Sequence, residues 1–432
     1  MKTVAFLPVK GTSERIHNKN LRIFNGEPLF VFTLKKLLRC SFIDSVYLDS
    51  ENEEILEIGN RLGAELLRRD PSLANNKTDG HQLFYNEVSK VDADIYIQHL
   101  CTSPFIKEET IKNAIEILKK NTEFDSVVLG KKEKCYFWSD GKPLYDTNKI
   151  PNSIDLPLVI TEAMSLYVMR GKVARETGRR IGRNPKMIFA DPIELIDINV
   201  EEDLKLAEKV GLGFISEEEK RLNVIGRFLS SSILSDVCDN LKLNCVLSSE
   251  YKSNINGAKL LGRARTLHIR KATSEDSDDS IYEALKSYKH VVNNDIIVVR
   301  NDLGKLAYFG ELNMSMAIRS GAKGAIISGV TRDTRETAEA GFPVFAKGSY
   351  CKDIKGHGAV ESMNKPIEID SVVIEPSDLI FADQDGIVVI PRKYEIQVLG
   401  GAISIMAAEK KIVEDVCQDV DLDSLVSKHG FF

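Results

Sequence analysis

Residues 5–29 read AFLPVKGTSERIHNKNLRIFNGEPL, and this stretch decides the fold. An apolar run from Val4 to Leu7 predicts a first β-strand, and a helical pattern begins near Leu29. The loop between them is basic and polar; it holds Gly11, Thr12, Ser13, Arg15, Lys19 and Asn20. After the first strand of an α/β sheet, such a loop commonly binds polyphosphates, because backbone N–H groups converge there and cations match the phosphate charges. The alternative is an ordinary strand-to-helix connection with solvated charges, and spacing alone leaves both open.

The overall composition bounds the classes of function. At 432 residues the chain is too long for one compact core, which predicts two domains. Its 43% hydrophobic and 28% charged residues are typical of a soluble globular protein. A net charge of −6 argues against nucleic acid as a partner, so any anion site must be local. Without a signal segment or an apolar run long enough to span a membrane, the sequence predicts a cytoplasmic protein with no membrane partner.

The seven cysteines are dispersed and form no C-x-x-C pair. An odd, scattered set predicts free thiols in a reducing compartment and argues against a zinc site or a disulfide framework. Cys351 and His357 have no further partners at metal-ligand spacing, so we interpret this pair as incidental.

Up to about residue 209, strands and helices alternate. The predicted strands are 3–8, 45–49, 64–68, 94–100 and 125–130, and the predicted helices are 29–39, 51–62, 81–90 and 107–120. This alternation predicts a mostly parallel sheet with helices on both faces. Ligands of such sheets bind at the carboxyl ends of the strands, where the 8–20 loop falls.

The periodicity changes near residue 210. Gly211 and Gly213 interrupt it, and Ser216 followed by three glutamates reads as a capping box that opens a new helix. We therefore expect domains at 1–212 and 213–432. Within the second domain we expect helices at 217–229, 232–240, 280–288 and 311–320, strands at 263–270, 295–300 and 323–328, and short β segments after 343.

The opening loop resembles the nucleotide loop of the CMP-sialic acid and CMP-Kdo synthetases. The shared pattern is Leu7-Pro8-x-Lys10-Gly11-x-Ser13-x-Arg15 followed by Lys19-Asn20. These cytidylyltransferases activate 2-keto-3-deoxy sugar acids. The resemblance implies that Lys10, Arg15 and Lys19 face the CTP phosphates, while the nucleotide is bound by Pro8, Gly11, Ser13 and Asn20. Lys10 stands where members usually have arginine, so it offers a point charge in place of a bidentate fork.

Two later segments resemble the same family. Gln98 and Thr102-Ser103-Pro104 match a segment that lines the sugar and nucleotide cleft; the alternative is a proline turn that caps a helix. Asp197 and Asn199 match an Asp-x-Asp pair that holds Mg²⁺ beside the phosphates, although a neutral Asn199 weakens it. Read without the family, Asn199 to Asp203 is an acidic helix start favoured by the helix dipole.

The expected reaction follows from these parts. The 2-hydroxyl of a sugar acid attacks the α-phosphorus of CTP in line and pyrophosphate leaves, with catalysis by charge stabilisation and positioning. Thr161-Glu162-Ala163-Met164 departs from the Glu-Asn-Gly-Ala that relatives often show, so the acid stays open, and a different acceptor such as a phosphonate remains an alternative. Arg68-Arg69-Asp70-Pro71 also matches a loop found across the group.

Residues 222–400 resemble a second family, the RraA-like fold, which includes class II 4-hydroxy-4-methyl-2-oxoglutarate aldolases. The matching segments are Ser235-Asp236, Gly262-Arg263-Ala264-Arg265-Thr266, Gly310-Glu311-Leu312-Asn313, Gly329-Val330-Thr331-Arg332-Asp333, Phe342-Pro343-Val344-Phe345-Ala346, Pro376-Ser377-Asp378 and Ala382-Asp383-x-Asp385-Gly386. The resemblance implies that Arg332 grips a pyruvate carboxylate and that Asp333 holds a divalent metal. Backbone amides of Leu312 and Asn313 would bind substrate oxygens, and Glu311 would order metal-bound water. The alternative is a surface ion pair at a helix start.

Together these observations predict an α/β protein. Its N-terminal domain would be a doubly wound, Rossmann-like nucleotidyltransferase, and its C-terminal domain an α/β RraA-like sandwich of the swivelling-domain type. The expected partners are small molecules, namely CTP, a sugar acid and pyruvate, with Mg²⁺ or another divalent metal in both domains. We also expect a homo-oligomer: a dimer, trimer or hexamer. The rival hypothesis makes the C-terminal domain a non-catalytic regulatory or assembly module.

Overall fold

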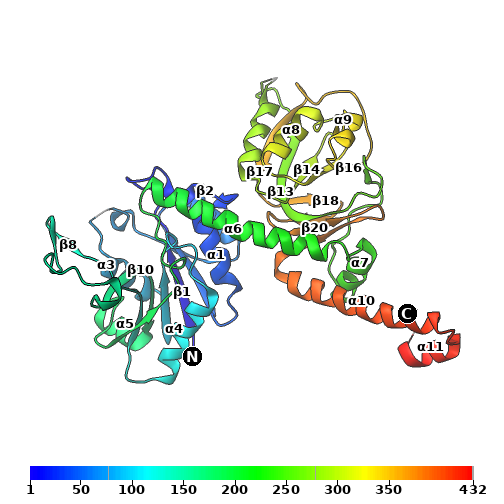
Figure 1. The fold of residues 1–432 in the computed structure, drawn as a ribbon. Helices are drawn as coiled ribbons and strands as arrows, with labels where there is room; N and C mark the ends of the chain where they lie inside the picture. The colour runs from blue at the N-terminus through cyan, green and yellow to red at the C-terminus, as the bar shows by residue number, and fades with distance from the viewer. Residues whose placement is uncertain (76, 278, 431–432) are drawn as a thin grey trace. The chain divides into compact units, whose positions relative to one another are not determined.

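The computed structural model describes residues 1–75, 77–277 and 279–430 (Figure 1). The chain forms two compact units, Met1–Gly211 and Leu212–Phe432. Each unit is built around a β-sheet of its own.

A seven-stranded sheet organises the first unit. β1 (Thr3–Pro8) has β4 (Ser45–Ser50) and then β5 (Glu65–Arg68) on one side and β6 (Ile95–His99) on the other, all parallel. Beyond β6 come antiparallel β10 (Val159–Arg170), then β7 (Ser126–Glu133) and β11 (Pro185–Phe189). The winding direction reverses at β1, and ligands of open α/β sheets bind at the carboxyl ends of the strands at such a point.

Side chains alternate along β1, so both faces of this sheet carry helices. Ala5 and Leu7 pack with α1 (Leu29–Arg39), α2 (Glu53–Arg61) and α4 (Glu108–Lys120). Val4 and Phe6 pack with α3 (Gly80–Val88) and α5 (Gly171–Thr177). A strand buried on both faces reads as a continuous apolar run, as this one does. The predicted doubly wound architecture is confirmed.

Helix α6 (Glu201–Ile225) corrects the predicted break after residue 210. The expected helix end at Gly211 and Gly213, with a capping box at Ser216, is wrong because α6 is continuous through all three residues. A helical glycine costs only about 1 kcal/mol relative to alanine, which tertiary packing overrides. A side chain would not fit at Gly211, because a Cβ atom there would lie 1.7 Å from Asn25 Nδ2. The local sequence thus predicts a helix break, whereas the folded chain forms one continuous helix.

The second unit contains an eight-stranded mixed sheet. Its parallel strands are β13 (Leu260–Lys271), β14 (Asp295–Asn301), β15 (Gly324–Ser328) and β16 (Val344–Ala346). Its antiparallel strands are β12 (Lys252–Ser253), β17 (Gly358–Met363), β20 (Leu379–Ala382) and β21 (Ile387–Ile390). Along β14, Ile297 and Val299 enter one core while Ile296 and Val298 enter another. Packing on both faces of this sheet confirms the predicted α/β sandwich.

Helices of the second unit pack around this sheet. They are α7 (Ser231–Asn240), α8 (Glu311–Arg319), α9 (Thr334–Glu339) and α10 (Glu395–Cys417), whereas α11 (Leu422–His429) packs against α10. A hairpin of β18 (Ile367–Ile369) and β19 (Val372–Ile374) closes the core on one face. The helix expected at 280–288 is a 3-10 helix, η4 (Ser280–His290), not an α-helix. Its buried Ile281 and Ala284 are three residues apart, a spacing that suits either an α-helix or a 3-10 helix. The type of helix therefore depends on how this segment packs against β17.

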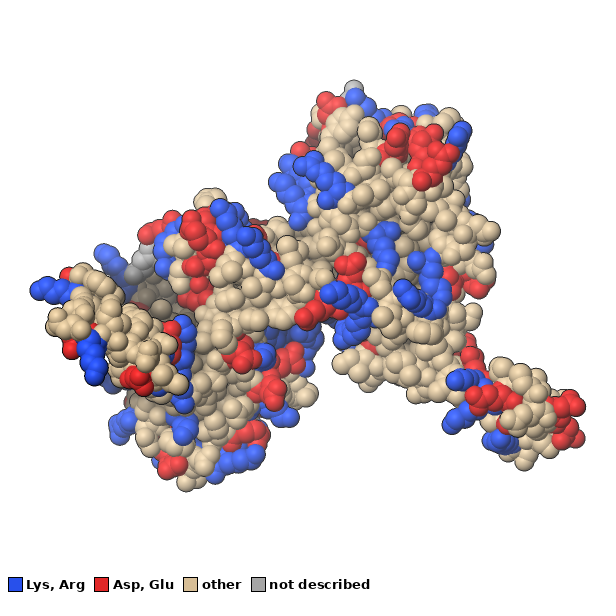
Figure 2. Space-filling view, in the orientation of Figure 1, with Lys and Arg blue, Asp and Glu red and all other residues tan. Residues whose placement is uncertain are grey.

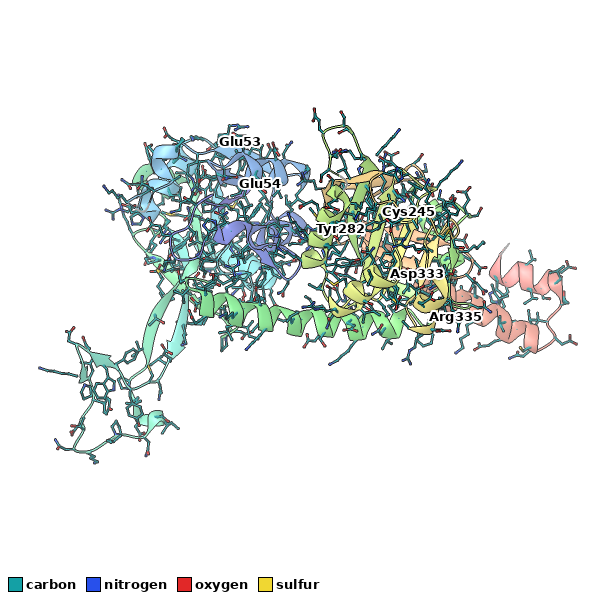
Figure 3. The ribbon with its side chains drawn as sticks, turned by 90° about the horizontal axis from the view of Figure 1, so that it is seen from above. Glu53, Glu54, Cys245, Tyr282, Asp333 and Arg335 are labelled. Atoms are coloured by element: carbon teal, nitrogen blue, oxygen red, sulfur yellow. The ribbon has the colours of Figure 1, made fainter. Side chains whose placement is uncertain are left out.

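Between β7 and β10 the chain leaves the sheet as an arm, which Figure 3 shows standing away from the rest of the first unit. The short strands β8 (Trp138–Ser139) and β9 (Lys142–Pro143) pair within it. Several of its large apolar side chains are exposed: Trp138, Leu144, Ile150 and Ile154. The arm leads directly into β10, which carries residues 161–164, the segment that departs from the pattern of the resembling family.

Charges of both signs are mixed on one face of the molecule. On the face drawn in Figure 2, Lys and Arg are interspersed with Asp and Glu. This distribution agrees with the small net charge of −6. Among the described residues, no helix combines the length and the apolarity needed to cross a membrane.

Candidate functional site

A cleft of about 600 Å³ opens at the carboxyl end of β1, where the sheet predicts a ligand. Its walls come from the loop after β1, the loop after β5, α3 and the loop after β6. The lining residues are Pro8, Lys10, Thr12, Ser13, Glu14, Arg15, Lys19, Asn20, Arg69, Leu73, Asn75, Thr78, Leu83, Leu100, Cys101 and Thr102. Four of them are cationic side chains, so the cleft suits a polyanion.

Most of the residues predicted for nucleotide binding come together here. Lining the cleft are Pro8, Lys10, Ser13, Arg15, Lys19, Asn20 and Thr102. The predicted residues outside its described lining are Gly11, Gln98, Ser103, Asp197 and Asn199. Within this loop, Gly11 faces the start of α2 and not the cleft. Its N–H donates to Glu51 Oε1 at 2.7 Å, and a Cβ atom would come within 2.7 Å of the Asn52 side chain.

Lys19 links the opening loop to the segment that precedes α6. Its Nζ is buried and donates to the carbonyl oxygen of Ile198 at 2.7 Å. Burial lowers the pKa of Lys19, an effect that Arg15 reinforces and Asp197 opposes. The predicted phosphate loop and the predicted metal segment are therefore neighbours.

Asn20 holds the same loop in shape. Its Nδ2 donates to the carbonyl oxygen of Lys10 at 2.8 Å, and its Oδ1 accepts from Cys101 Sγ at 3.3 Å. Both ends of this buried amide are used within the protein. Asn20 therefore fixes the backbone that carries Lys10.

Asp197 sits between a hydroxyl and an amide. Its Oδ1 accepts from Ser103 Oγ at 3.4 Å, and its Oδ2 accepts from Asn199 Nδ2 at 2.6 Å. Among the described residues, no three His, Cys, Asp or Glu side chains gather to hold a metal by themselves. Magnesium, however, uses one or two protein carboxylates and completes its shell with water and phosphate oxygens. Asp197 fits such a site, and Asn199 acts here as a partner of Asp197.

Gln98 departs from its predicted place in the cleft. It is 0% exposed, and its Nε2 donates to Glu87 Oε2 at 2.6 Å inside the unit. The cleft instead presents Arg69, which the sequence did not single out as a site residue. The sequence signal for Arg69 was the match of its loop to the family. That loop contains both Arg68 and Arg69, and the sequence does not show which of the two is buried at the cleft.

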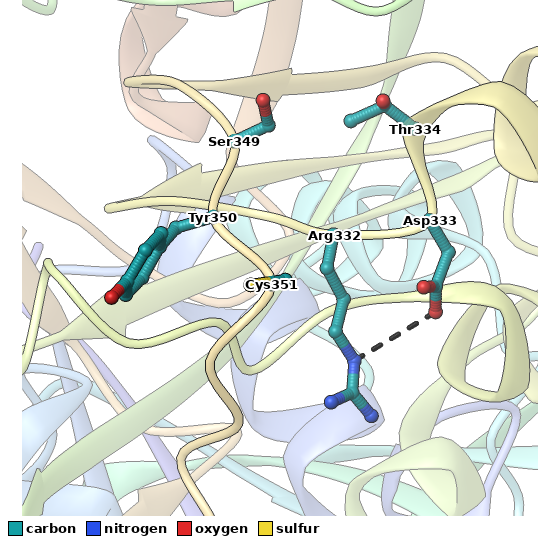
Figure 4. A pocket seen from close by; sticks show the side chains of 6 residues that line it. All are labelled: Arg332, Asp333, Thr334, Ser349, Tyr350 and Cys351. Carbon is teal, nitrogen blue, oxygen red and sulfur yellow. Dashed lines mark ion pairs between the residues drawn. The ribbon is translucent and has the colours of Figure 1, made fainter.

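The second unit has a pocket of about 370 Å³ lined by Arg332, Asp333, Thr334, Ser349, Tyr350 and Cys351 (Figure 4). Arg332 Nε is 3.7 Å from Asp333 Oδ2, and its Nη1 is 2.5 Å from Asp353 Oδ2. Asp333 has φ +52°, the left-handed region, immediately before α9. This turn aims the Arg332 and Asp333 side chains at the same space.

The start of α8, for which the sequence predicts binding residues, contacts Asp333 of this pocket. Glu311 N–H donates to Asp333 Oδ2 at 3.0 Å. A Cβ atom on Gly310 would lie 2.4 Å from that same oxygen, so glycine permits the approach. Leu312 is 81% exposed, and Tyr288 donates to Asn313 Oδ1 at 2.9 Å. First-turn N–H groups of a helix have no intrahelical acceptor, which leaves those of Leu312 and Asn313 suited to oxygen ligands.

Comparison with known proteins assigns each half separately. Residues 4–170 match the cytidylyltransferase family and residues 234–389 match the RraA-like family, described as Aldolase/RraA. A protein of Halalkalibacterium halodurans, described as a 4-hydroxy-4-methyl-2-oxoglutarate aldolase, is 30% identical over 195 residues, covering 45% of this chain and 84% of that protein.

The N-terminal half has relatives among sugar-acid enzymes. The pseudaminic acid cytidylyltransferase of Campylobacter jejuni is 26% identical and is covered over 95% of its length by 48% of this chain. The CMP-N,N'-diacetyllegionaminic acid synthase of Legionella pneumophila is 25% identical, with 96% of its length covered by 49% of this chain.

The chain as a whole has a further relative in Protein DlpA of Legionella pneumophila, to which it is 29% identical over 185 residues; these are 42% of this chain and only 29% of that protein.

The two matches fall on the two units, each over its own sheet and cleft. The chain therefore belongs to the Aldolase/RraA family through its C-terminal half, and its N-terminal half is a cytidylyltransferase-family domain that resembles the CMP-sugar-acid synthases.

Proposed function

We propose that residues 1–212 transfer CMP from CTP to a 2-keto-3-deoxy sugar acid of the nonulosonic type. The observation that carries the proposal is the cleft at the end of β1, where Lys10, Arg15 and Lys19 line one wall beside the Asp197 segment. Relatives that act on pseudaminic and legionaminic acids support an acid of this size. We assign a separate, aldolase-type activity to residues 213–432, which is argued below.

The reaction balances as a nucleotidyl transfer. The 2-hydroxyl oxygen of the acid forms a bond to the α-phosphorus, the bond from that phosphorus to the β-bridging oxygen breaks, and the hydroxyl proton passes to solvent as pyrophosphate leaves. Lys10, Arg15 and Lys19 hold the triphosphate and stabilise the charge that develops on it. A divalent ion held by Asp197 would neutralise phosphate charge when bound. Asn20 keeps the loop in the shape that presents Lys10.

A pyrophosphate-release screen of the full chain tests this proposal. CTP, Mg²⁺ and a panel of ulosonic acids together with a phosphonate are the substrates, with ATP, GTP and UTP as controls of base choice. Arg15→Ala should raise the KM for CTP by about tenfold or more, because a charge-assisted contact to phosphate is lost. Arg61→Ala, an exposed arginine on α2, is the matched control and should change nothing. Unchanged turnover after both Arg15→Ala and Asp197→Asn would refute the site, and release only with a phosphonate would favour the alternative acceptor.

We propose further that the second unit is a pyruvate aldolase acting on the same class of acid. Arg332, Asp333 and the N–H of Glu311 converge on one pocket, which suits a carboxylate held beside a metal-stabilised enolate. Aldol addition of pyruvate is reversible, so capture of the product as a CMP-sugar would draw synthesis forward. We expect the full chain to act as a homo-oligomer.

Arg332→Ala separates the catalytic from the regulatory hypothesis. A catalytic Arg332 predicts loss of pyruvate release from 2-keto acids while the oligomeric state, measured by light scattering, stays the same. Arg335→Ala, whose side chain is 82% exposed on α9, is the control. If wild-type protein turns over no 2-keto acid with any divalent metal, the C-terminal unit is a regulatory or assembly module.

A further inference from the structure

A buried polar cluster lies behind the nucleotide cleft. It comprises Asp49 at the end of β4, Arg69 after β5, Glu87 on α3 and Gln98 on β6. Asp49, Glu87 and Gln98 are 0% exposed and Arg69 is 5% exposed, yet Arg69 also lines the cleft. The cluster therefore connects the cleft wall to the interior of the unit.

The positive charge of Arg69 is already matched without Glu87. Its Nε and Nη2 donate to Asp49 Oδ2 at 3.1 and 2.8 Å, and Nη2 also donates to the Asp49 carbonyl oxygen at 2.8 Å. Its Nη1 is 3.7 Å from Glu51 Oε2. An ionised Glu87 would add a further negative charge beside the fully buried Asp49 and Gln98, and an unpaired buried charge costs several kcal/mol.

Three side-chain oxygen atoms in the cluster are buried and receive no N–H or O–H from the described residues: Asp49 Oδ1, Glu87 Oε1 and Gln98 Oε1. The first two belong to carboxyl groups, and the other carboxyl oxygen of Glu87, Oε2, accepts from Gln98. Asp49 is also a near neighbour of Glu87, since the charge of Asp49 is among the causes that raise the pKa of Glu87. Two neighbouring carboxylates repel each other and cannot share a hydrogen bond unless one of them carries a proton. One proton satisfies both oxygens and removes the surplus charge.

We propose that Glu87 is a positioning residue held in its neutral acid form, which donates its proton to Asp49 and thereby fixes the Arg69 guanidinium against the cleft wall. The role of Glu87 in positioning Arg69 for a nucleotide rests on the proposed function, whereas the proton shared with Asp49 does not. Burial first, and then the charge of Asp49, raises the pKa of Glu87 well above its usual value. The groups that face it are Asp49 from β4, Arg69 after β5 and Gln98 from β6, with Glu51 beyond Arg69.

The proposal predicts a pH dependence with a defined sign. The folded chain keeps a proton on Glu87 that the unfolded chain releases, so its stabilisation is complete below the unfolded pKa and is lost as pH rises through the folded pKa. Glu87→Gln keeps a neutral donor of the same shape and should remove this alkaline loss. Glu54→Gln, an exposed glutamate on α2, is the matched control and should leave the profile of the wild type.

Infrared spectroscopy of the full chain reads the proton directly. At neutral pH the carbonyl band of a protonated carboxyl should be present in the wild type and in Glu54→Gln and absent from Glu87→Gln. In Asp49→Asn the band should remain, because burial still keeps Glu87 neutral, but it should shift in frequency, because the acid no longer donates to a carboxylate. An unchanged band in Glu87→Gln, or a band of unaltered frequency in Asp49→Asn, would overturn the proposal.

Kinetics then test the positioning role. Glu87→Gln should keep the KM for CTP within about twofold, while Glu87→Ala, which leaves Asp49 Oδ1 without a donor, should raise it by about tenfold or more with a smaller effect on kcat. Equal impairment of the two variants would show that Glu87 must be ionised and would contradict the proposal. If Glu87→Ala does not fold, the spectrum and Glu87→Gln still decide. If the wild type has no cytidylyltransferase activity, the proposed function fails while the infrared result stands.

Discussion

The two candidate sites differ in how far their charged side chains are exposed to solvent. In the first unit, Lys19 and Arg69 are 8% and 5% exposed, and each is fixed by hydrogen bonds inside the protein. In the second unit, the side chains of Arg332 and Asp333 are 34% and 39% exposed. The first site therefore has two cations, Lys19 and Arg69, that are already oriented before a ligand arrives, whereas the second has a solvated ion pair at the mouth of a pocket.

This difference separates the roles of stability and binding. A buried, hydrogen-bonded charge pair cannot lose one member without a large penalty, because the other is left unpaired. An exposed pair contributes little to folding and can exchange its protein partner for a ligand at low cost. The first site should therefore be sensitive to mutation through both folding and binding, and the second through function alone.

Arg69→Ala should have the largest effect. It leaves the Asp49 carboxylate buried without its cation, so we expect a loss of about 3–5 kcal/mol of unfolding free energy. Arg68→Ala is a control of the same residue type one position away, since Arg68 is 65% exposed and pairs with an equally exposed Glu53; it should cost less than about 1 kcal/mol. Urea unfolding of the full chain, followed by circular dichroism, measures both, and similar costs would erase the distinction between the two sites.

Gly310→Ala tests how closely the C-terminal pocket is packed. The added Cβ atom would lie 2.4 Å from Asp333 Oδ2 and 3.0 Å from Arg332 Cγ, so both side chains must move. We expect a cost of about 1–3 kcal/mol and loss of any turnover of 2-keto acids. Gly400→Ala on α10, where no atom lies within 4 Å, is the control and should be neutral or stabilising. Wild-type turnover in Gly310→Ala would show that Asp333 need not hold its observed place.

Lys36 extends the comparison to a buried cation outside the cleft. Burial lowers the pKa of Lys36 to about 7. Between that value and the ordinary value of 10.5 the unfolded chain binds a proton that the folded chain does not, so stability should rise with pH by about 1.4 kcal/mol per unit. Lys36→Met should remove this slope, which has the opposite sign to that expected from Glu87. Urea midpoints measured from pH 6 to 10 give the answer, and an unaltered slope in the variant would assign it to another group.

Arg332→Ala should have the smallest effect on folding. We expect a change of less than about 1 kcal/mol in unfolding free energy, because its partners are half-exposed and solvent screens them. The same variant should abolish pyruvate chemistry if the proposed aldolase is correct. A cost comparable with that of Arg69→Ala would place Arg332 in a structural role and would end the contrast between the two sites.

Local pattern predicted much of this architecture. The strand at 3–8 and the helix at 29–39 have the predicted bounds, because apolar periodicity and the sharp loop between them are local properties. The loop residues Lys10, Arg15 and Lys19 line one cleft because they all follow the same strand end. The glycines of α6 misled the prediction, since the contact of Gly211 with Asn25 joins residues far apart in the chain.

The sequence by itself determined two α/β halves, the position of the basic loop after the first strand and the family of each half, because strand and helix periods and short motifs are written in neighbouring residues. Only the tertiary structure decided that Gln98 turns inward to Glu87 and that Arg69 lines the cleft. The physical reason lies in the sheet. β6 is buried on both faces, so its sequence has no polar alternation to indicate which face each side chain takes. The partner that satisfies a buried polar group comes from another strand or helix, and its identity depends on how the strands are ordered.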